Sequence, residues 1–259
     1  MQPRHLLRRV AQSTGVSPFR VHELVAQPEF ASLRRRSLVL GASDGARLDR
    51  LRRSAPFLSH EQFLQSSEPP NDLIEPMTTK LAEALQQQDS QAPATFGHVF
   101  LVDDFAGSGR TLLRTSDGEW KGKLFKLHDA VNRMRGAGLL ADDVDVTVIL
   151  YVASQQAQEH LAATIASSDL PPWELRVVQT LPNSVRVDET DPEMADLAVR
   201  FYDDVLTDEH KGSAPLGYAD CALPLVLSHN TPNNSISLLW ADTTGEAGSL
   251  NRLALFPRY

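Results

Sequence analysis

Apolar runs and amphipathic segments alternate along the second half of the chain. The apolar runs resemble strands buried on both faces and lie at residues 98–102, 144–152 and 175–181. The segments between them are predicted to be helical and cover residues 121–135 and 155–165. Strands that alternate with helices indicate βαβ units. The predicted fold class is therefore α/β, a Rossmann-like and mostly parallel sheet with helices on both faces.

The first half predicts a small helical extension that leads into this sheet. Residues 3–30 are expected to form short helices, interrupted at Pro18 and Pro28. The next expected elements are a strand at 37–40, which stops at Gly41, and helices at about 45–53 and 73–88.

The C-terminal part is expected to complete the domain with a hood of strands. We predict a helix over residues 193–206 and strands at 222–227 and 236–240. The expected organisation is an N-terminal helical extension, residues 1–30, followed by one α/β domain, residues 31–259.

Composition excludes several protein classes. Apolar residues make up 42% and charged residues 22%, which are ordinary globular values. Cys221 is the single cysteine, so an internal disulfide and a cysteine-based metal cluster are excluded. No apolar run approaches the roughly 20 residues of a membrane span, and the N-terminus lacks an apolar signal segment. We expect a cytoplasmic protein without a membrane partner.

Charge is distributed unevenly between the start and the rest of the chain. Residues 1–60 hold eleven arginines against four acidic residues, whereas the whole chain has a net charge of −8. A basic first quarter is compatible with an arm that faces nucleic acid or phosphate. The more common case is a solvated helix end that pairs with the acidic remainder, so direct nucleic-acid binding stays open.

The most informative stretch follows the apolar run at 98–102. Two adjacent carboxylates stand where open α/β sheets place ligands. A loop of small residues comes next and a helix is expected to begin after it, which together favour a phosphate. The residues expected to hold such a phosphate ligand and its ribose hydroxyls are Asp103, Asp104, Phe105, Ala106, Gly107, Ser108, Gly109, Arg110 and Thr111.

This stretch resembles the phosphoribosyl-pyrophosphate (PRPP) motif of type I phosphoribosyltransferases. That motif is an apolar strand, an acid pair, three variable residues, then Thr or Ser, Gly, any residue and Thr. The matching positions are Asp103–Asp104, Ser108–Gly109 and Thr111. The resemblance implies a PRPP-dependent transferase with Mg²⁺, in which Asp103 and Asp104 hold the ribose hydroxyls, serve catalysis and contribute weakly to the metal site. One departure is Gly107, which stands where several purine enzymes of the family carry an Asp that assists the base.

Two other interpretations of the same stretch are less favourable. A Walker A loop would need glycine at Asp104 and lysine at Arg110, so an ATPase is not expected. The stretch could instead be a buried strand that ends in an Asp-rich, helix-capping turn.

A second loop of small residues precedes this motif in the chain. In type I phosphoribosyltransferases such a loop meets the pyrophosphate, and small residues permit its close approach. The residues expected to do so are Ala42, Ser43, Asp44, Gly45 and Arg47. Taken alone, the same loop could be an ordinary strand-to-helix turn.

A third loop gathers hydrogen-bonding side chains near the C-terminus. We expect Asn230, Asn233 and Asn234 to hold the acceptor and His229 to act as catalytic base, although a plain turn is the alternative. The stretches GYADCALPLVLSHNTPNNSISLLW and RRSLVLGASDGARLDRLRR resemble phosphoribosyltransferase-like proteins of bacterial conflict and antiphage-defence loci. This resemblance implies an effector that acts on a nucleotide or nucleic acid.

The N-terminus offers a competing function. Residues 10–21 resemble a helix-turn-helix, although Arg20 is the only basic residue of the second helix. A non-catalytic, nucleotide-sensing regulator therefore remains the alternative to an enzyme. The expected partners are PRPP or a nucleotide, a second copy of the chain in a homodimer, and a protein partner in a defence complex. The three tryptophans are expected in the core or at its rim and are Trp120, Trp173 and Trp240.

Overall fold

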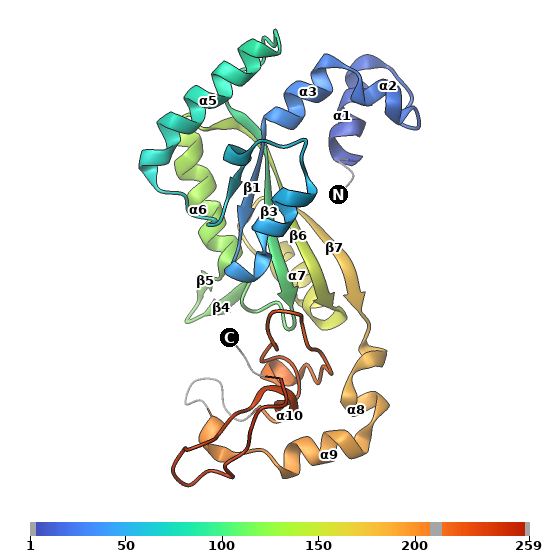
Figure 1. The fold of residues 1–259 in the computed structure, drawn as a ribbon, viewed down its shortest axis with the longest axis vertical. Helices are drawn as coiled ribbons and strands as arrows, with labels where there is room; N and C mark the ends of the chain where they lie inside the picture. The colour runs from blue at the N-terminus through green and yellow to red at the C-terminus, as the bar shows by residue number, and fades with distance from the viewer. Residues whose placement is uncertain (1–3, 208–213, 257–259) are drawn as a thin grey trace. The chain divides into compact units, whose positions relative to one another are not determined.

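The predicted α/β class is confirmed by a computed structural model that describes residues 4–207 and 214–256. Its main sheet has the strand order β2-β1-β3-β6-β7 (Figure 1). The five strands are β2 (Phe63–Leu64), β1 (Ser37–Gly41), β3 (Phe96–Ala106), β6 (Leu140–Ser154) and β7 (Glu174–Leu181). Strand β1 runs parallel to both β2 and β3. The predicted N-terminal extension and α/β domain also contain residues 1–3, 208–213 and 257–259, which lie outside the described residues.

The central strands form because their side chains are apolar on both faces. All five residues of β1 are buried, and Val99, Leu101 and Val102 of β3 are fully buried. In the parallel register Gly41 pairs with Val102. The carboxyl ends of β1 and β3 therefore lie side by side, and the loops that follow them start from the same edge of the sheet.

Most of the predicted helices are also confirmed. They are α1 (Arg4–Thr14), α2 (Val21–Val25), α3 (Pro28–Arg35), α4 (Leu48–Ser54), α5 (Ile74–Gln87), α6 (Lys123–Gly136) and α7 (Gln155–Ser167). Within α5 the predicted apolar face is buried at Met77, Leu81 and Leu85, whereas Leu73 precedes the helix and is exposed. In the part of the chain that the structure describes, no helix has the length and apolar character to cross a bilayer.

By their contacts the residues form two compact units. The first comprises residues 1–104, 123–149 and 170–176, and the second comprises residues 105–122, 150–169 and 177–259. Strands β3, β6 and β7 each begin in the first unit and end in the second. The predicted boundary at residue 30 is a different division and stays a prediction.

Helices α1, α2 and α3 pack on one another at the start of the first unit. Their shared core contains Leu6, Val10, Leu24 and Phe30. Helix α2, the second helix of the helix-turn-helix resemblance, has only five residues and therefore offers a short surface for reading a DNA groove.

The helix expected after the phosphate loop does not form. Leu112 and Leu113 donate to the carbonyl of Gly109, which makes a single turn, and the chain then enters a hairpin. The hairpin pairs β4 (Arg114–Ser116) with β5 (Glu119–Lys121) through an Asp117–Gly118 turn in which both residues have positive φ. An Asp-Gly pair favours a two-residue hairpin turn, so the chain forms a hairpin here and does not continue as a helix.

The helix predicted over 193–206 is shorter than expected. Helix α9 (Pro192–Arg200) follows the single turn α8 (Val187–Thr190) and ends before Asp203, whose carboxylate caps the next turn and accepts from Leu250. Much of its predicted apolar side is exposed, including Leu197, Val199 and Phe201.

The predicted hood strands are wrong. Segment 222–227 makes only isolated bridges, Leu223 to Ser235 and Leu227 to Asn230, and residues 237–240 form the helix α10 (Ser237–Trp240). Positive φ angles at Ala219, Asp220 and Ala222 turn the backbone away from strand geometry. In addition, Pro224 cannot donate to a ladder.

A buried ion pair fixes the end of α3 in the first unit. The Arg35 side chain is 5% exposed and donates to Glu61 Oε1 at 2.7 Å and to the Lys80 carbonyl at 3.3 Å. Burial lowers the pKa of Arg35, and the Glu61 carboxylate opposes that shift. The guanidinium is thus largely removed from water and depends on Glu61 for charge compensation.

We predict that Glu61→Gln lowers the free energy of unfolding by about 2–3 kcal/mol, because it leaves the buried Arg35 charge without compensation. Adding Arg35→Met should restore part of this loss. Glu68→Gln is the matched control, because its contact with Lys126 is exposed and 3.9 Å long. Urea unfolding measures all variants, and equal effects of Glu61→Gln and Glu68→Gln would contradict the prediction.

Candidate functional site

The acid pair lies at the carboxyl end of β3, where the sequence places it. Asp103 is buried, with 2% of the residue exposed, and Asp104 is half-buried. Both oxygens of Asp103 are engaged: Ser43 Oγ donates to Oδ1 at 2.5 Å, and Lys123 Nζ donates to Oδ2 at 2.7 Å. The two adjacent carboxylates therefore differ in exposure.

The pKa of Asp103 reflects these opposing influences. Burial raises the pKa, whereas the Lys123 ammonium and the hydrogen bond from Ser43 lower it. The net direction is upward. Without Lys123, the same carboxylate would be an uncompensated charge inside the protein.

The small-residue loop after β1 meets the acid pair in the first unit. Ala42 donates its N–H to the Val102 carbonyl at 2.9 Å, and Ser43 follows with its hydroxyl on Asp103. A Cβ at Gly45 would come within 2.5 Å of the Asp104 carboxylate. Glycine at this position is therefore required for the loop to approach Asp104 closely.

The last residues of this loop are directed by local contacts. Arg47 adopts a left-handed conformation with φ of 46°, and its Nε atom lies 3.6 Å from the Asp49 carboxylate as an ion pair. Asp44 is exposed at the start of a short 3₁₀ turn. The Arg47 side chain is half-buried. Its contact with a pyrophosphate stays a prediction.

Lys123 is a site residue that the sequence analysis missed. It is the first residue of α6, its side chain is 26% exposed, and its ammonium lies 2.7 Å from Asp103. It follows Gly122, whose φ of 127° and close contact with the Leu112 carbonyl leave no room for a side chain. Lys123 stands twenty positions after Asp103, so no local motif joins the two residues.

The phosphate loop continues the motif in the second unit. No hydrogen bond within the described part of the chain engages the backbone N–H groups of Gly107, Ser108 and Gly109. Consecutive free N–H groups form a concave donor surface of the kind that binds anions. Ser154 connects this loop to α7: its hydroxyl donates to the Gly107 carbonyl and accepts a hydrogen bond from Ala157 N at the start of α7.

The remaining loop residues divide by exposure. The buried residues are Ala106, Gly107, Ser108 and Gly109; Phe105 is half-buried, and Arg110 and Thr111 are exposed. At Gly109 the φ of 74° favours glycine, and a Cβ there would press on α7 at Ala157 and His160. The loop therefore packs closely against α7, and the element that follows it is the strand β4, not a helix.

Gly107 has a packing reason that the sequence did not reveal. A Cβ on Gly107 would overlap the side chain of Asn234. Asn234 is 8% exposed and donates to the Tyr218 carbonyl at 3.0 Å and to Cys221 Sγ at 3.3 Å. An aspartate at this position would not fit without displacing Asn234.

The C-terminal loop is a tight turn in the second unit. Leu227 and Asn230 exchange backbone hydrogen bonds at 2.9 and 3.3 Å, with the half-buried His229 between them. The Asn230 Oδ1 atom is buried and accepts no hydrogen bond among the described residues. Asn234 uses its side-chain amide for internal hydrogen bonds. Acceptor binding by Asn230 and Asn233 therefore stays a prediction, as does the role of His229 as a base.

The buried Cys221 is held as a neutral thiol. Burial raises its pKa to about 11, although the hydrogen bond from Asn234 lowers it. A thiol with this pKa is protonated at neutral pH, so Cys221 is a packing residue that supports Asn234.

We predict that Gly107→Ala lowers the free energy of unfolding by about 2 kcal/mol, because the added methyl group collides with Asn234. Asn234→Ala alone loses two hydrogen bonds, and the double variant should cost less than the sum because the methyl group enters the vacated space. Gly136→Ala is the control, since nothing lies within 4 Å of its Cβ. Additive effects in urea unfolding would refute this contact.

Comparison with known proteins gives one match. A family model described as PRTase-CE matches residues 57–258, which include the acid pair, the phosphate loop, Lys123 and the 227–234 turn. No curated protein and no solved structure matches the chain. The expected phosphoribosyltransferase-like family is thereby confirmed, and its narrowing to defence loci stays a prediction. The chain belongs to the PRTase-CE family.

Proposed function

We propose that the protein binds PRPP, or the 5-phosphoribosyl part of a nucleotide, at residues 103–111 and transfers the phosphoribosyl group to an acceptor. The observation that carries this proposal is the split acid pair. Asp103 is buried and ion-paired, whereas Asp104 is half-buried beside a glycine-containing loop. The family match supports the reaction class.

The two aspartates take different parts in this proposal. Asp104 accepts hydrogen bonds from the ribose hydroxyls, as a partly exposed carboxylate can. Asp103 positions the site by fixing Ser43 and Lys123. The free N–H groups of Gly107, Ser108 and Gly109 hold the 5-phosphate.

The donor set fits a Mg²⁺ ion that arrives with the substrate. Among the described residues, no group of three or more His, Cys, Asp or Glu side chains could hold a metal. Mg²⁺ commonly uses one or two carboxylates together with substrate phosphates. Asp104 is the carboxylate that would hold it, and the bound ion would neutralise charge on the pyrophosphate.

The proposed reaction breaks the bond between C1 of PRPP and the pyrophosphate oxygen. The acceptor's lone pair forms the new bond to C1, pyrophosphate leaves with the bonding electrons, and a base takes the acceptor's proton. His229 is our candidate for that base. Cations such as Lys123 and Arg47 favour the build-up of negative charge on the leaving group.

A second candidate function is a sensor that binds the ribose phosphate without turnover. The occupied Asp103 carboxylate favours it, because a carboxylate with both oxygens engaged is less available to a substrate. Release of pyrophosphate from PRPP in the presence of candidate bases separates the enzyme from the sensor.

We predict that Asp104→Asn weakens PRPP binding about 10- to 100-fold, because a hydrogen bond to a charged group contributes about 1.5–3 kcal/mol. Calorimetry in the presence of Mg²⁺ measures the affinity. Asp117→Asn is the matched control, since the Asp117 side chain is 88% exposed at the hairpin turn. Unchanged affinity of Asp104→Asn would exclude this site.

A further inference from the structure

The first unit contains a cavity of about 360 Å³ that the proposed function does not use. Its lining comes from the beginnings of β3 and β6, from α6 and from residues 171–174. His98 in its floor precedes Asp103 by five residues on β3, which corresponds to roughly 16 Å along a strand. The cavity is therefore at the opposite end of that strand from the acid pair.

One wall of the cavity is aromatic. Trp173 is half-buried and follows Pro171 and Pro172, and its backbone N–H donates to the Pro171 carbonyl at 2.7 Å. The ring centroids of Trp173 and His128 lie 6.3 Å apart with an interplanar angle of 47°. Two rings at the edge of one cavity offer flat surfaces on which a planar ligand can stack.

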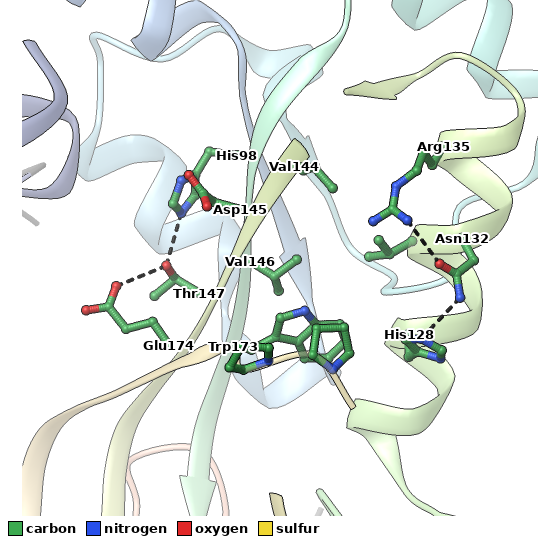
Figure 2. Close-up of a pocket in the computed structure, with 13 residues that line it drawn as sticks. His98, His128, Asn132, Arg135, Val144, Asp145, Val146, Thr147, Trp173 and Glu174 are labelled. Atoms are coloured by element: carbon green, nitrogen blue, oxygen red, sulfur yellow. Dashed lines mark hydrogen bonds between the residues drawn. The ribbon is translucent and has the colours of Figure 1, made fainter. Parts of the chain in front are cut away.

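A second wall is a row of polar side chains on α6. Figure 2 shows His128, Asn132 and Arg135 following one another along the helix beside the cavity. Asn132 Nδ2 lies 3.2 Å from His128 Nε2, and Arg135 Nη1 donates to Asn132 Oδ1 at 3.5 Å. The Arg135 Nε atom is buried without a hydrogen-bond partner among the described residues.

The charges around the cavity are unequally satisfied. Asp145 pairs with Arg9 at 2.6 Å, and Glu174 pairs with Arg176 at 2.7 Å. Arg135, in contrast, forms no ion pair with any described acidic side chain. A ligand that supplies acceptor atoms to Arg135 would satisfy a group that the protein itself leaves unsatisfied.

We propose that this cavity binds the base of a free guanine nucleoside, separately from the ribosyl-phosphate motif. Guanine presents N7 and O6 acceptors, which match an arginine fork, and a planar face, which matches Trp173. A volume of about 360 Å³ is within the range of small-molecule sites.

Calorimetry with guanosine, which carries no phosphate, tests this site in the full-length protein. We expect guanosine to bind, and Arg135→Gln and Trp173→Leu each to weaken binding about tenfold or more. Trp173→Phe, which keeps an aromatic face, should bind more tightly than Trp173→Leu. Lys126→Gln is the matched control, because it removes an exposed cation from the same helix outside the cavity lining.

Asp104→Asn separates this inference from the proposed function, because it should leave guanosine affinity unchanged even where it weakens PRPP binding. The inference is overturned by absence of guanosine binding up to about 1 mM, by wild-type affinity in Arg135→Gln, or by loss of binding in Asp104→Asn. Binding of a guanine-containing oligonucleotide without binding of guanosine also overturns it.

Discussion

The buried carboxylate of Asp103 is the constraint on which the candidate site depends. A carboxylate with 2% exposure has lost most of its hydration and requires compensation, which it receives from Ser43 at 2.5 Å and Lys123 at 2.7 Å. Those contacts tie together the end of β3, the loop after β1 and the first residue of α6. Three segments that are distant in sequence are thereby held around one charge, and the adjacent Asp104 is half-buried.

The same constraint explains how a family motif can be adapted. Asp103 is buried and positions Ser43 and Lys123. In our proposal Asp104 therefore binds the ribose hydroxyls. In the second unit, Gly107 leaves the space that Asn234 occupies, and Ser154 fixes the loop's backbone. The absence of a side chain at residue 107 is therefore explained by packing against Asn234.

The sequence predicted what depends on local periodicity. The central strands and helices α5, α6 and α7 followed from apolar patterns, and the motif at residues 103–111 was recognised from its residues at the carboxyl end of a predicted strand. The hairpin after the phosphate loop was missed although Asp117–Gly118 signalled it. The hood strands failed because backbone angles at residues such as Ala222 are not visible in an apolar pattern. Lys123 and Asn234 were out of reach as contacts, since only tertiary structure brings them to Asp103 and Gly107.

Phosphorus NMR of PRPP tests the central claim most directly, because the 5-phosphate and the pyrophosphate give separate resonances. With Mg²⁺ present, adding the protein should shift or broaden the 5-phosphate resonance, and Asp104→Asn should largely abolish the effect at the same concentration. Free pyrophosphate should appear when the acceptor is supplied. A PRPP spectrum that the wild-type protein leaves unchanged would contradict the account.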